Sequence, residues 1–383
     1  MEKKRIFLSS PTMNGREMEY IQEAFDTNWI APLGKNVDGF EAELGDYIKK
    51  HQGEGCQEDE YDLAALSSGT AAIHLALKLA GVKEGDTVFC STLTFAASAN
   101  PILYEKAVPV FIESERESWN MSPESLAEAF EKYPECRVVI CANLYGTPAR
   151  LNRIREICEA HHAVLIEDAA ESLGASYEGR QTGTFGDYGI FSFNGNKMIT
   201  TSGGGMILCH TKEEAQKARF YATQAREPAR HYEHKEIGYN YRMSNIVAGI
   251  GRGQLWTLDE YIERKRVIYD IYQSAFADIP GVSMNPVPEG AKANHWLSCI
   301  LLGENVSVTP DEIMDALAEE NIESRPIWKP MHMQPVFSDC GYVHAGERVS
   351  EEIFRRGVCL PSDIKNTPED MDRIIGIIKR CFA

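Results

Sequence analysis

Short apolar runs alternate with longer amphipathic stretches from about residue 62 to residue 210. The apolar runs are rich in β-branched and aromatic residues, which predicts strands at Asp62–Leu66, Thr87–Ser91, Val108–Ile112, Arg137–Ala142, Ala163–Glu167, Tyr188–Phe193 and Gly205–Cys209. Between these runs, apolar residues recur at helical spacing, which predicts helices at Thr70–Ala80, Ala96–Lys106, Pro123–Lys132 and Leu151–Ala160. Parallel neighbours need crossover connections of this length. We therefore expect an α/β fold in which helices sandwich a mainly parallel, seven-stranded sheet.

The pattern changes in the C-terminal third of the chain. A helix is predicted at Lys212–Gln224 and a long helical stretch at Ser244–Phe276, followed by a strand at His295–Leu302 and helices at Pro310–Glu319, Ser350–Arg356 and Pro368–Lys379. A chain of 383 residues exceeds the usual single-domain size of about 100–200 residues. We expect a large α/β domain at residues 1–250 and a smaller α+β domain at residues 251–383, joined by the long helix.

The chain is acidic, with 57 Asp and Glu residues against 39 Lys and Arg residues and a formal net charge of −18 at pH 7. No basic run is long enough to follow a phosphate backbone, so we expect no nucleic-acid partner. The longest apolar runs are too short to span a bilayer, and no apolar stretch of signal-peptide length follows the N-terminus. We expect a soluble, cytoplasmic protein with no membrane partner.

Ten cysteines are scattered along the chain without a C-x-x-C pair, several of them inside apolar runs. A reduced thiol in such a run behaves as a small hydrophobe. The one weak candidate for metal binding is formed by His231, Glu233 and His234, and no further ligand pair stands at a recognisable spacing. We therefore expect no metal site.

Ser68, Gly69 and Thr70 stand between a predicted strand and a predicted helix. At such a place, free backbone N–H groups and the positive end of the helix dipole point toward any bound anion. Gly69 allows close approach of the backbone, and the hydroxyl of Ser68 or Thr70 could donate to a phosphate. Ser and Thr also occur at this place simply as N-caps. Neither a P-loop nor a G-x-G-x-x-G fingerprint is present.

Asp168 ends an apolar strand and so stands at the carboxyl edge of the sheet, where ligands collect in folds of this kind. Its carboxylate could bind a metal, a ribose or a ring nitrogen, or it could cap the following helix. Lys197 follows 29 residues later, just after the strand that ends at Phe193. A lysine in a loop is most often a solvated cation, but the apolar neighbours Phe193, Met198 and Ile199 suggest an enclosed, reactive amine.

An anion site, a strand-end carboxylate and an enclosed lysine together are what pyridoxal 5'-phosphate (PLP) requires. The anion site would hold the phosphate, Asp168 would hold the pyridinium proton, and Lys197 would form a Schiff base. When a substrate amine displaces it, Lys197 is free to move a proton between the substrate Cα and C4′ of the cofactor. Phe95, which follows the second predicted strand, could stack on the ring face or be a core aromatic.

These residues lie in motifs that resemble the DegT-type nucleotide-sugar aminotransferases, which are fold-type I PLP enzymes. The resemblance covers almost the whole chain, and its highly specific motifs are NWIAPLG, SSGTAAIHLAL, IEDAAESLGA, FSFNGNKMITTSGGG, QAREPARHYEHKEIGYNYRMSN and RPIWKPMHMQP. Within the family, the chain looks most similar to enzymes that aminate C4 of UDP-4-keto-6-deoxy-N-acetylhexosamines, including those of bacillosamine and exopolysaccharide pathways.

The resemblance implies a role for each matching residue. Lys197 would be the Schiff-base lysine and Asp168 the pyridinium partner. Glu171 would lie beside the ring near its hydroxyl, at a position where Gln is also common in the family. Asn240 would reach the phosphate from the neighbouring subunit, which implies an obligate homodimer with shared active sites. The other cofactor-binding residues would be Gly69, Thr70 and Ser192 at the phosphate and Phe95 on the ring.

The resemblance also implies L-glutamate as the amino donor and a nucleotide-linked keto sugar as the acceptor. The candidate substrate contacts are Trp29, Asn194, Arg226, Trp328 and His332. The aromatic candidates could equally be packing residues at the domain interface. A C3 ketone, a keto-inositol, and a regulator that kept the fold without catalysis are alternatives. Some relatives with His at the lysine position do not transaminate, so Lys197 favours an aminotransferase.

Overall fold

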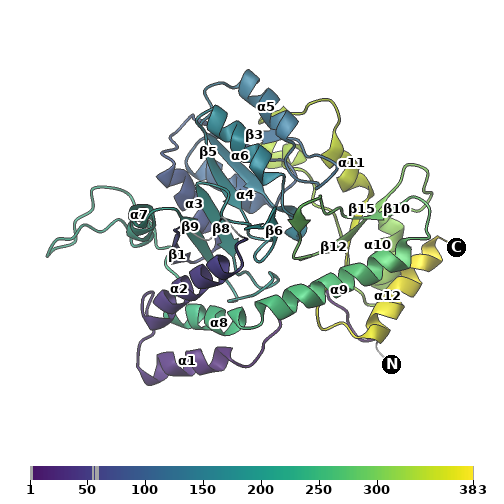
Figure 1. Ribbon diagram of the computed structural model, residues 1–383, viewed down its shortest axis with the longest axis horizontal. Coiled ribbons are helices and arrows are strands. Elements are labelled where there is room, and N and C mark those ends of the chain that lie inside the picture. Colours follow the sequence, from purple (N-terminus) through teal and green to yellow (C-terminus); the bar gives the residue numbers. More distant parts are fainter. Residues whose placement is uncertain (1–2, 54–55, 57–59, 383) are drawn as a thin grey trace.

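The computed structural model describes residues 3–53, 56 and 60–382. All seven predicted strands lie in one eight-stranded sheet (Figure 1), in which β9 runs antiparallel to its neighbours and the strands from β8 to β14 run parallel. The strands in order across the sheet are β1 (Asp62–Leu66), β9 (Gly205–Cys209), β8 (Tyr188–Ser192), β5 (Val164–Asp168), β4 (Val138–Ala142), β2 (Thr87–Ser91), β3 (Val108–Ile112) and β14 (Gly341–Val343). The eighth strand, β14, was not predicted, because its three residues carry too short a pattern.

Helices cover both faces of this sheet. Val138 and Ile140 of β4 face one core, and Val139 and Cys141 face the other, as the alternation of side chains along a strand requires. The first core also contains α3 (Gly69–Leu79), α4 (Ala96–Tyr104) and α7 (Lys212–Ala222), and the second contains α5 (Pro123–Lys132) and α6 (Leu151–Ala160). The predicted helices between strands are therefore present, and most of their predicted ends differ from the observed ends by only one or two residues.

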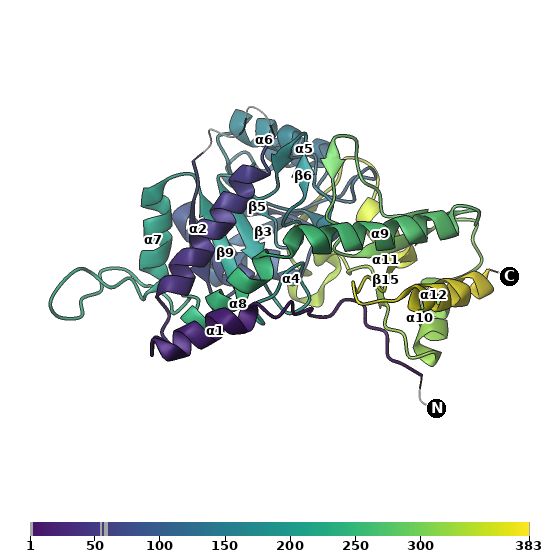
Figure 2. The same ribbon diagram turned by 60° about the horizontal axis from the view of Figure 1, so that its bottom comes forward.

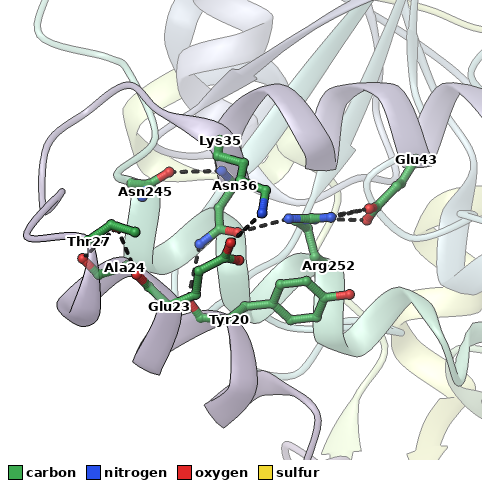
Figure 3. A network of polar contacts seen from close by, with 9 residues as sticks. All are labelled: Tyr20, Glu23, Ala24, Thr27, Lys35, Asn36, Glu43, Asn245 and Arg252. Atoms are coloured by element: carbon green, nitrogen blue, oxygen red, sulfur yellow. Dashed lines mark hydrogen bonds and ion pairs between the residues drawn. The ribbon is translucent and has the colours of Figure 1, made fainter.

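A polar network joins two helices that were not predicted from the sequence to the start of the predicted long helix (Figure 3). The two helices are α1 (Glu17–Asp26) and α2 (Lys35–Lys50), and the long helix starts with α8 (Asn245–Leu255). The guanidinium of Arg252 contacts both carboxylate oxygens of Glu43, and its Nη1 donates to Oδ1 of Asn36 at 3.0 Å. Asn245 accepts from the Asn36 amide at 2.9 Å, and Asn36 donates to the carbonyl of Tyr20 at 3.1 Å. These contacts lock the three helices together.

The long helix predicted at Ser244–Phe276 is two helices in the structure. Helix α8 ends before Trp256 and α9 (Leu258–Phe276) begins after Thr257, whose φ and ψ of −113° and 8° lie outside the helical region. Figure 2 shows that the pair runs from the large sheet to the C-terminal elements. A periodic pattern cannot reveal such a break, because α9 resumes the same apolar spacing.

The C-terminal elements form an antiparallel sheet with helices. Its strands are β10 (Val282–Met284), β12 (Ser298–Leu302), β15 (Gly357–Leu360) and β13 (Arg325–Pro326), and its helices are α10 (Pro310–Glu319), α11 (Val349–Arg356) and α12 (Pro368–Cys381). The strand predicted from His295 begins only at Ser298, because His295 has a φ of 51°, which is not extended backbone. A third, small sheet joins β11 (Ala291–Lys292), β6 (Ser176–Tyr177) and β7 (Arg180–Gln181).

Two segments reach across the predicted domain boundary at residue 250. Strand β14 pairs with β3 of the large sheet, and Ile6 near the N-terminus forms a bridge with Ile322 of the C-terminal part. The residues that the structure describes also contain three short 3-10 helices, namely Leu144–Gly146, Met331–Met333 and Pro335–Phe337. The division at residue 250 stays a prediction. Among the described residues, no helix is long and apolar enough to cross a bilayer.

Candidate active site

A cavity of about 330 Å³ lies where β5 and β8 end and α3 begins. These elements bring together parts of the chain that are far apart in sequence, as expected for the carboxyl edge of a parallel sheet. The predicted site residues that line the cavity are Gly69, Thr70, Phe95, Asp168, Glu171, Ser192, Asn194, Lys197 and Trp328.

The start of α3 forms the anion-binding side of this cavity. Ser68 caps the helix, since its side chain accepts from the amide of Ala71 at 3.0 Å. A helix leaves the first amide groups of its opening turn without partners inside the helix, and the amides of Gly69 and Thr70 stand there. A Cβ atom at Gly69 would lie 3.1 Å from Cβ of Ser192, which is tighter than usual packing. Glycine therefore lets the helix start lie against the end of β8.

Asp168 is the last residue of β5 and is 7% exposed. One carboxylate oxygen accepts from the hydroxyl of Ser98 at 2.6 Å, and the other accepts from the amide of Ala170 at 3.1 Å. Burial raises the pKa of Asp168, while both hydrogen bonds and the charge of Lys197 oppose the rise. The hydroxyl of Thr94 lies 2.7 Å from that of Ser98, so a short polar chain holds the carboxylate in place.

Lys197 lies in the loop between β8 and β9, and its amine points into the same cavity. The Nζ atom lies 3.5 Å from Oε1 of Glu171 and 4.0 Å from the ring centre of Trp296. The second oxygen of Glu171 accepts from the amide of Tyr145 at 2.7 Å. The lysine is therefore enclosed between a carboxylate and an indole face, which is a favourable place for a cation.

The free energy of unfolding should depend on pH through Glu171. Burial raises the pKa of Glu171 from its ordinary 4.5 to about 7, against the opposing charge of Lys197. An acid with a raised pKa binds its proton more tightly in the folded state, so the free energy of unfolding falls as the pH rises between these values. Between pH 4.5 and pH 7, the free energy of unfolding of the wild-type protein should fall by up to about 3 kcal/mol more than that of Glu171→Gln. Urea denaturation of the cofactor-free proteins from pH 4.5 to pH 7.5 measures this difference, and parallel pH profiles would contradict it.

An aromatic wall closes the other side of the cavity. Phe95 is 56% exposed and its ring lies 5.4 Å from that of Trp328. Trp328 also contacts Tyr145 at 5.0 Å, and Trp296 lies 6.2 Å from Trp328. The sequence reading missed Trp296, Tyr145 and Ser98 as parts of the site. Nothing in their local sequence distinguishes them from ordinary core residues.

Four predicted residues lie outside the lining of this cavity. His332 lies beneath the loop that carries Phe95, where its Nδ1 contacts Oγ1 of Thr92 at 2.6 Å and its ring stacks on Tyr342. Trp29 lines a separate cavity beside Gly34 and α8. Arg226 and Asn240 both belong to the segment after α7, where Arg226 pairs with His234 and Asn240 pairs with Thr223 at the end of α7. The loop after α7 extends away from the body of the molecule in both ribbon views (Figures 1 and 2). Within the described part of the chain, no group of three His, Cys, Asp or Glu residues could hold a metal ion.

A model of the DegT/DnrJ/EryC1/StrS aminotransferase family matches residues 11–379. The chain belongs to this family. EpsN of Bacillus subtilis (strain 168), described as a putative pyridoxal phosphate-dependent aminotransferase, is 50% identical over 385 residues, which cover 99% of this chain and 96% of the relative. GDP-perosamine synthase of Escherichia coli O157:H7 is 35% identical, with 94% of this chain and 93% of the relative covered.

A solved structure of a DegT DnrJ EryC1 StrS aminotransferase from Brucella abortus is also similar, with a TM-score of 0.85 and 28% identity over 96% of this chain and 95% of that chain. The predicted fold class, the aminotransferase activity and the use of PLP are thus confirmed. The roles of the individual residues stay predictions.

The residues that line the cavity fit PLP, because they offer separate groups to its phosphate, to its ring nitrogen and for covalent attachment. The helix start at Gly69 offers amide groups to a phosphate, and glycine there lets the helix start lie close to Ser192. The buried carboxylate of Asp168 faces the cavity from the end of β5, and the amine of Lys197 enters it from the loop after β8. The arrangement therefore has a place for the phosphate, a partner for the ring nitrogen and a nucleophile.

Proposed function

We propose that this aminotransferase moves the amino group of L-glutamate to the C4 ketone of a nucleotide-linked 4-keto-6-deoxy sugar, for polysaccharide or glycan biosynthesis. UDP-4-keto-6-deoxy-N-acetylglucosamine is the first candidate acceptor. The observation that carries the proposal is the placement of Lys197, Asp168 and Glu171 around one cavity in a chain of this family. A GDP-linked sugar is the second candidate, because a relative that is 35% identical is a GDP-perosamine synthase.

Each residue of the cavity has a defined task in this proposal. PLP, when bound, supplies a ring that withdraws electrons from the substrate Cα. Asp168 holds a proton on the ring nitrogen, and its two hydrogen bonds keep its carboxylate aimed at the cavity. Lys197 holds the cofactor covalently, and after release its amine carries a proton to and from the substrate Cα. Glu171, at 3.5 Å from that amine, orients it.

The acceptor sugar would lie against the aromatic wall. Trp328 presents an apolar ring to the cavity beside Phe95, which would stack on the cofactor ring, and Asn194 offers an amide at the edge of the cavity. Apolar faces with a few convergent polar groups suit a hexose, which has both apolar and hydroxyl-bearing faces.

A second copy of the chain would complete the site. No arginine lines the cavity among the residues that the structure describes, although both glutamate and a nucleotide diphosphate carry negative charge. Arg226 and Asn240 belong to the segment after α7, whose loop extends from the body, and this segment of a neighbouring copy could reach the cavity (Figure 1). We therefore propose a homodimer with shared active sites. A holoenzyme that sediments only as a monomer would contradict it.

The acceptor assay tests the proposed reaction directly. The holoenzyme is given L-glutamate and, in parallel, the UDP-linked and GDP-linked 4-keto-6-deoxy sugars, a C3 keto sugar and a keto-inositol. We expect release of 2-oxoglutarate and an amine at C4 of the UDP-linked sugar, with NMR of the product giving its axial or equatorial configuration. Turnover of only the GDP-linked sugar selects the second candidate. Glutamate consumption with none of the C4 ketones accepted would reject the proposal.

A further inference from the structure

Lys265 is a buried lysine on α9, outside the lining of the cofactor cavity, with 4% of its surface exposed. Its ammonium donates to the carbonyl of Ser362 at 2.6 Å, the carbonyl of Trp296 at 3.0 Å and the hydroxyl of Ser9 at 3.1 Å. These contacts use all three donors, and every acceptor is uncharged. Burial lowers the pKa of Lys265 to about 7, while the charge of Asp363 opposes this. Burial of an ammonium group among uncharged acceptors costs free energy, which indicates a specific task for this side chain.

Trp296 carries the contact from Lys265 to the active site. Its carbonyl accepts from Lys265, and its indole Nε1 donates to the carbonyl of Asn196 at 2.6 Å. The face of the same indole lies 4.0 Å from Nζ of Lys197. The residue that Lys265 holds by its backbone is therefore the residue that supports the amine of Lys197.

Ser9 provides a second route to the same place. Its hydroxyl accepts from Lys265 at 3.1 Å and donates to the carbonyl of Asn196 at 3.4 Å. Both routes converge on this carbonyl, and Asn196 directly precedes Lys197 in the chain. The ammonium thus ties the N-terminal segment and the segment before β12 to the loop that carries Lys197.

We propose that Lys265 is a positioning residue of the aminotransferase, which holds Trp296 and the Asn196 carbonyl so that the amine of Lys197 is directed into the cavity. Lys265 makes none of its three hydrogen bonds to Lys197 and lies outside the lining of the cofactor cavity, so it acts through these two residues. The proposal concerns Lys197 and the step with the amino donor, and it is independent of the acceptor sugar.

The test compares Lys265→Met with a matched control, Lys365→Met, in the holoenzyme. Lys365 is half exposed and donates to Oγ of Ser10 and to the carbonyl of Pro11, so the control also removes a lysine contact to the N-terminal segment but leaves Trp296 untouched. Lys265→Met should lower kcat of the L-glutamate half-reaction about 10- to 100-fold with little change in KM, because a misdirected amine reacts slowly. At equal cofactor content it should also weaken the visible circular dichroism of bound PLP, and the control should change neither.

A cycle with Trp296→Phe separates positioning from simple stability. If Lys265 acts through Trp296, Lys265→Met should cost much less in kcat when Trp296 is already Phe. Independent effects both in this cycle and in the matching cycle with Ser9→Ala, which removes the second route, would overturn the proposal. Wild-type kcat and visible circular dichroism in a Lys265→Met protein with a lowered melting temperature would overturn it as well. Should Lys265→Met not accumulate as folded protein, Lys265→Gln, whose amide keeps two donors, takes its place in the same cycle with the same deciding outcomes.

Discussion

Lys197→Ala should abolish covalent attachment of PLP and lower the rate of transamination by at least about 10⁴-fold, because both the nucleophile and the proton carrier are lost. The amine of Lys197 is the one lysine amine that lines the described cavity. Alanine leaves the indole face of Trp296 and the carboxylate of Glu171 in place, so the cavity keeps its shape. Reduction with borohydride followed by mass spectrometry measures attachment, and single-turnover kinetics with L-glutamate measure the rate.

Lys132→Ala is a suitable control, since this lysine lies on the surface of α5 and pairs with Glu128 of the same helix. The control should keep full attachment and full rate. Added methylamine should restore part of the activity of Lys197→Ala, because a small amine can enter the vacated space and carry the proton. Turnover of the alanine variant near the wild-type rate, with no added amine, would rule out the assigned role of Lys197.

Asp168→Asn should lower the rate about 10²- to 10³-fold while the cofactor remains attached to Lys197, because the neutral amide no longer stabilises a positive charge on the ring nitrogen. The two effects distinguish the residues: Lys197 is needed for attachment, whereas Asp168 is needed for the chemistry that follows. Asn has nearly the shape of Asp, and its oxygen can still accept from the hydroxyl of Ser98, whereas its NH2 group cannot accept from the amide of Ala170. The loss should therefore reflect the missing charge and this one hydrogen bond rather than packing.

The measurement combines the rate of the L-glutamate half-reaction with the visible absorption of the bound cofactor. Asp86→Asn serves as the control, because Asp86 lies on the surface where it accepts from the amide of Lys83. An Asp168→Asn enzyme with a wild-type half-reaction would show that the ring nitrogen needs no carboxylate partner, and the assignment of Asp168 would fall.

Much of the large sheet could be predicted from local pattern. The strands from β1 to β9 that form it are short apolar runs with crossover helices between them, and that pattern has one common solution. Helix α2 carries a helical apolar stripe, Val37, Phe40, Leu44 and Ile48, which the sequence analysis did not use. Helix α1 was missed because it buries few apolar residues and depends on tertiary contacts, such as that of the Tyr20 carbonyl with Asn36. Strand β14 was missed for a related reason, since its three residues are too few to show a pattern and are identified as a strand by their pairing with β3.

The candidate site divides in the same way. Lys197, Asp168 and Gly69 could be predicted because each stands next to a strand end or a helix start, and the edge of a parallel sheet brings such positions together. Trp296 could not be predicted, because it lies 99 residues after Lys197 and touches it only across the junction with the C-terminal sheet. Trp29 and His332 lie outside the lining of this cavity for the same reason. The local sequence around an aromatic residue carries no signal for the cavity that it will line.

The sequence alone determined which segments of the large domain form most of its strands and helices, and it revealed the strand-end acid and the loop lysine, because these follow from periodicity and from residues adjacent in the chain. Only the tertiary structure decided which indole supports Lys197, which hydroxyl holds Asp168, and that a buried lysine on α9 joins three distant segments behind the site. These contacts depend on how the C-terminal sheet and the N-terminal segment dock on the large sheet. Docking of this kind is set by packing between distant residues, for which no stretch of local sequence carries a pattern.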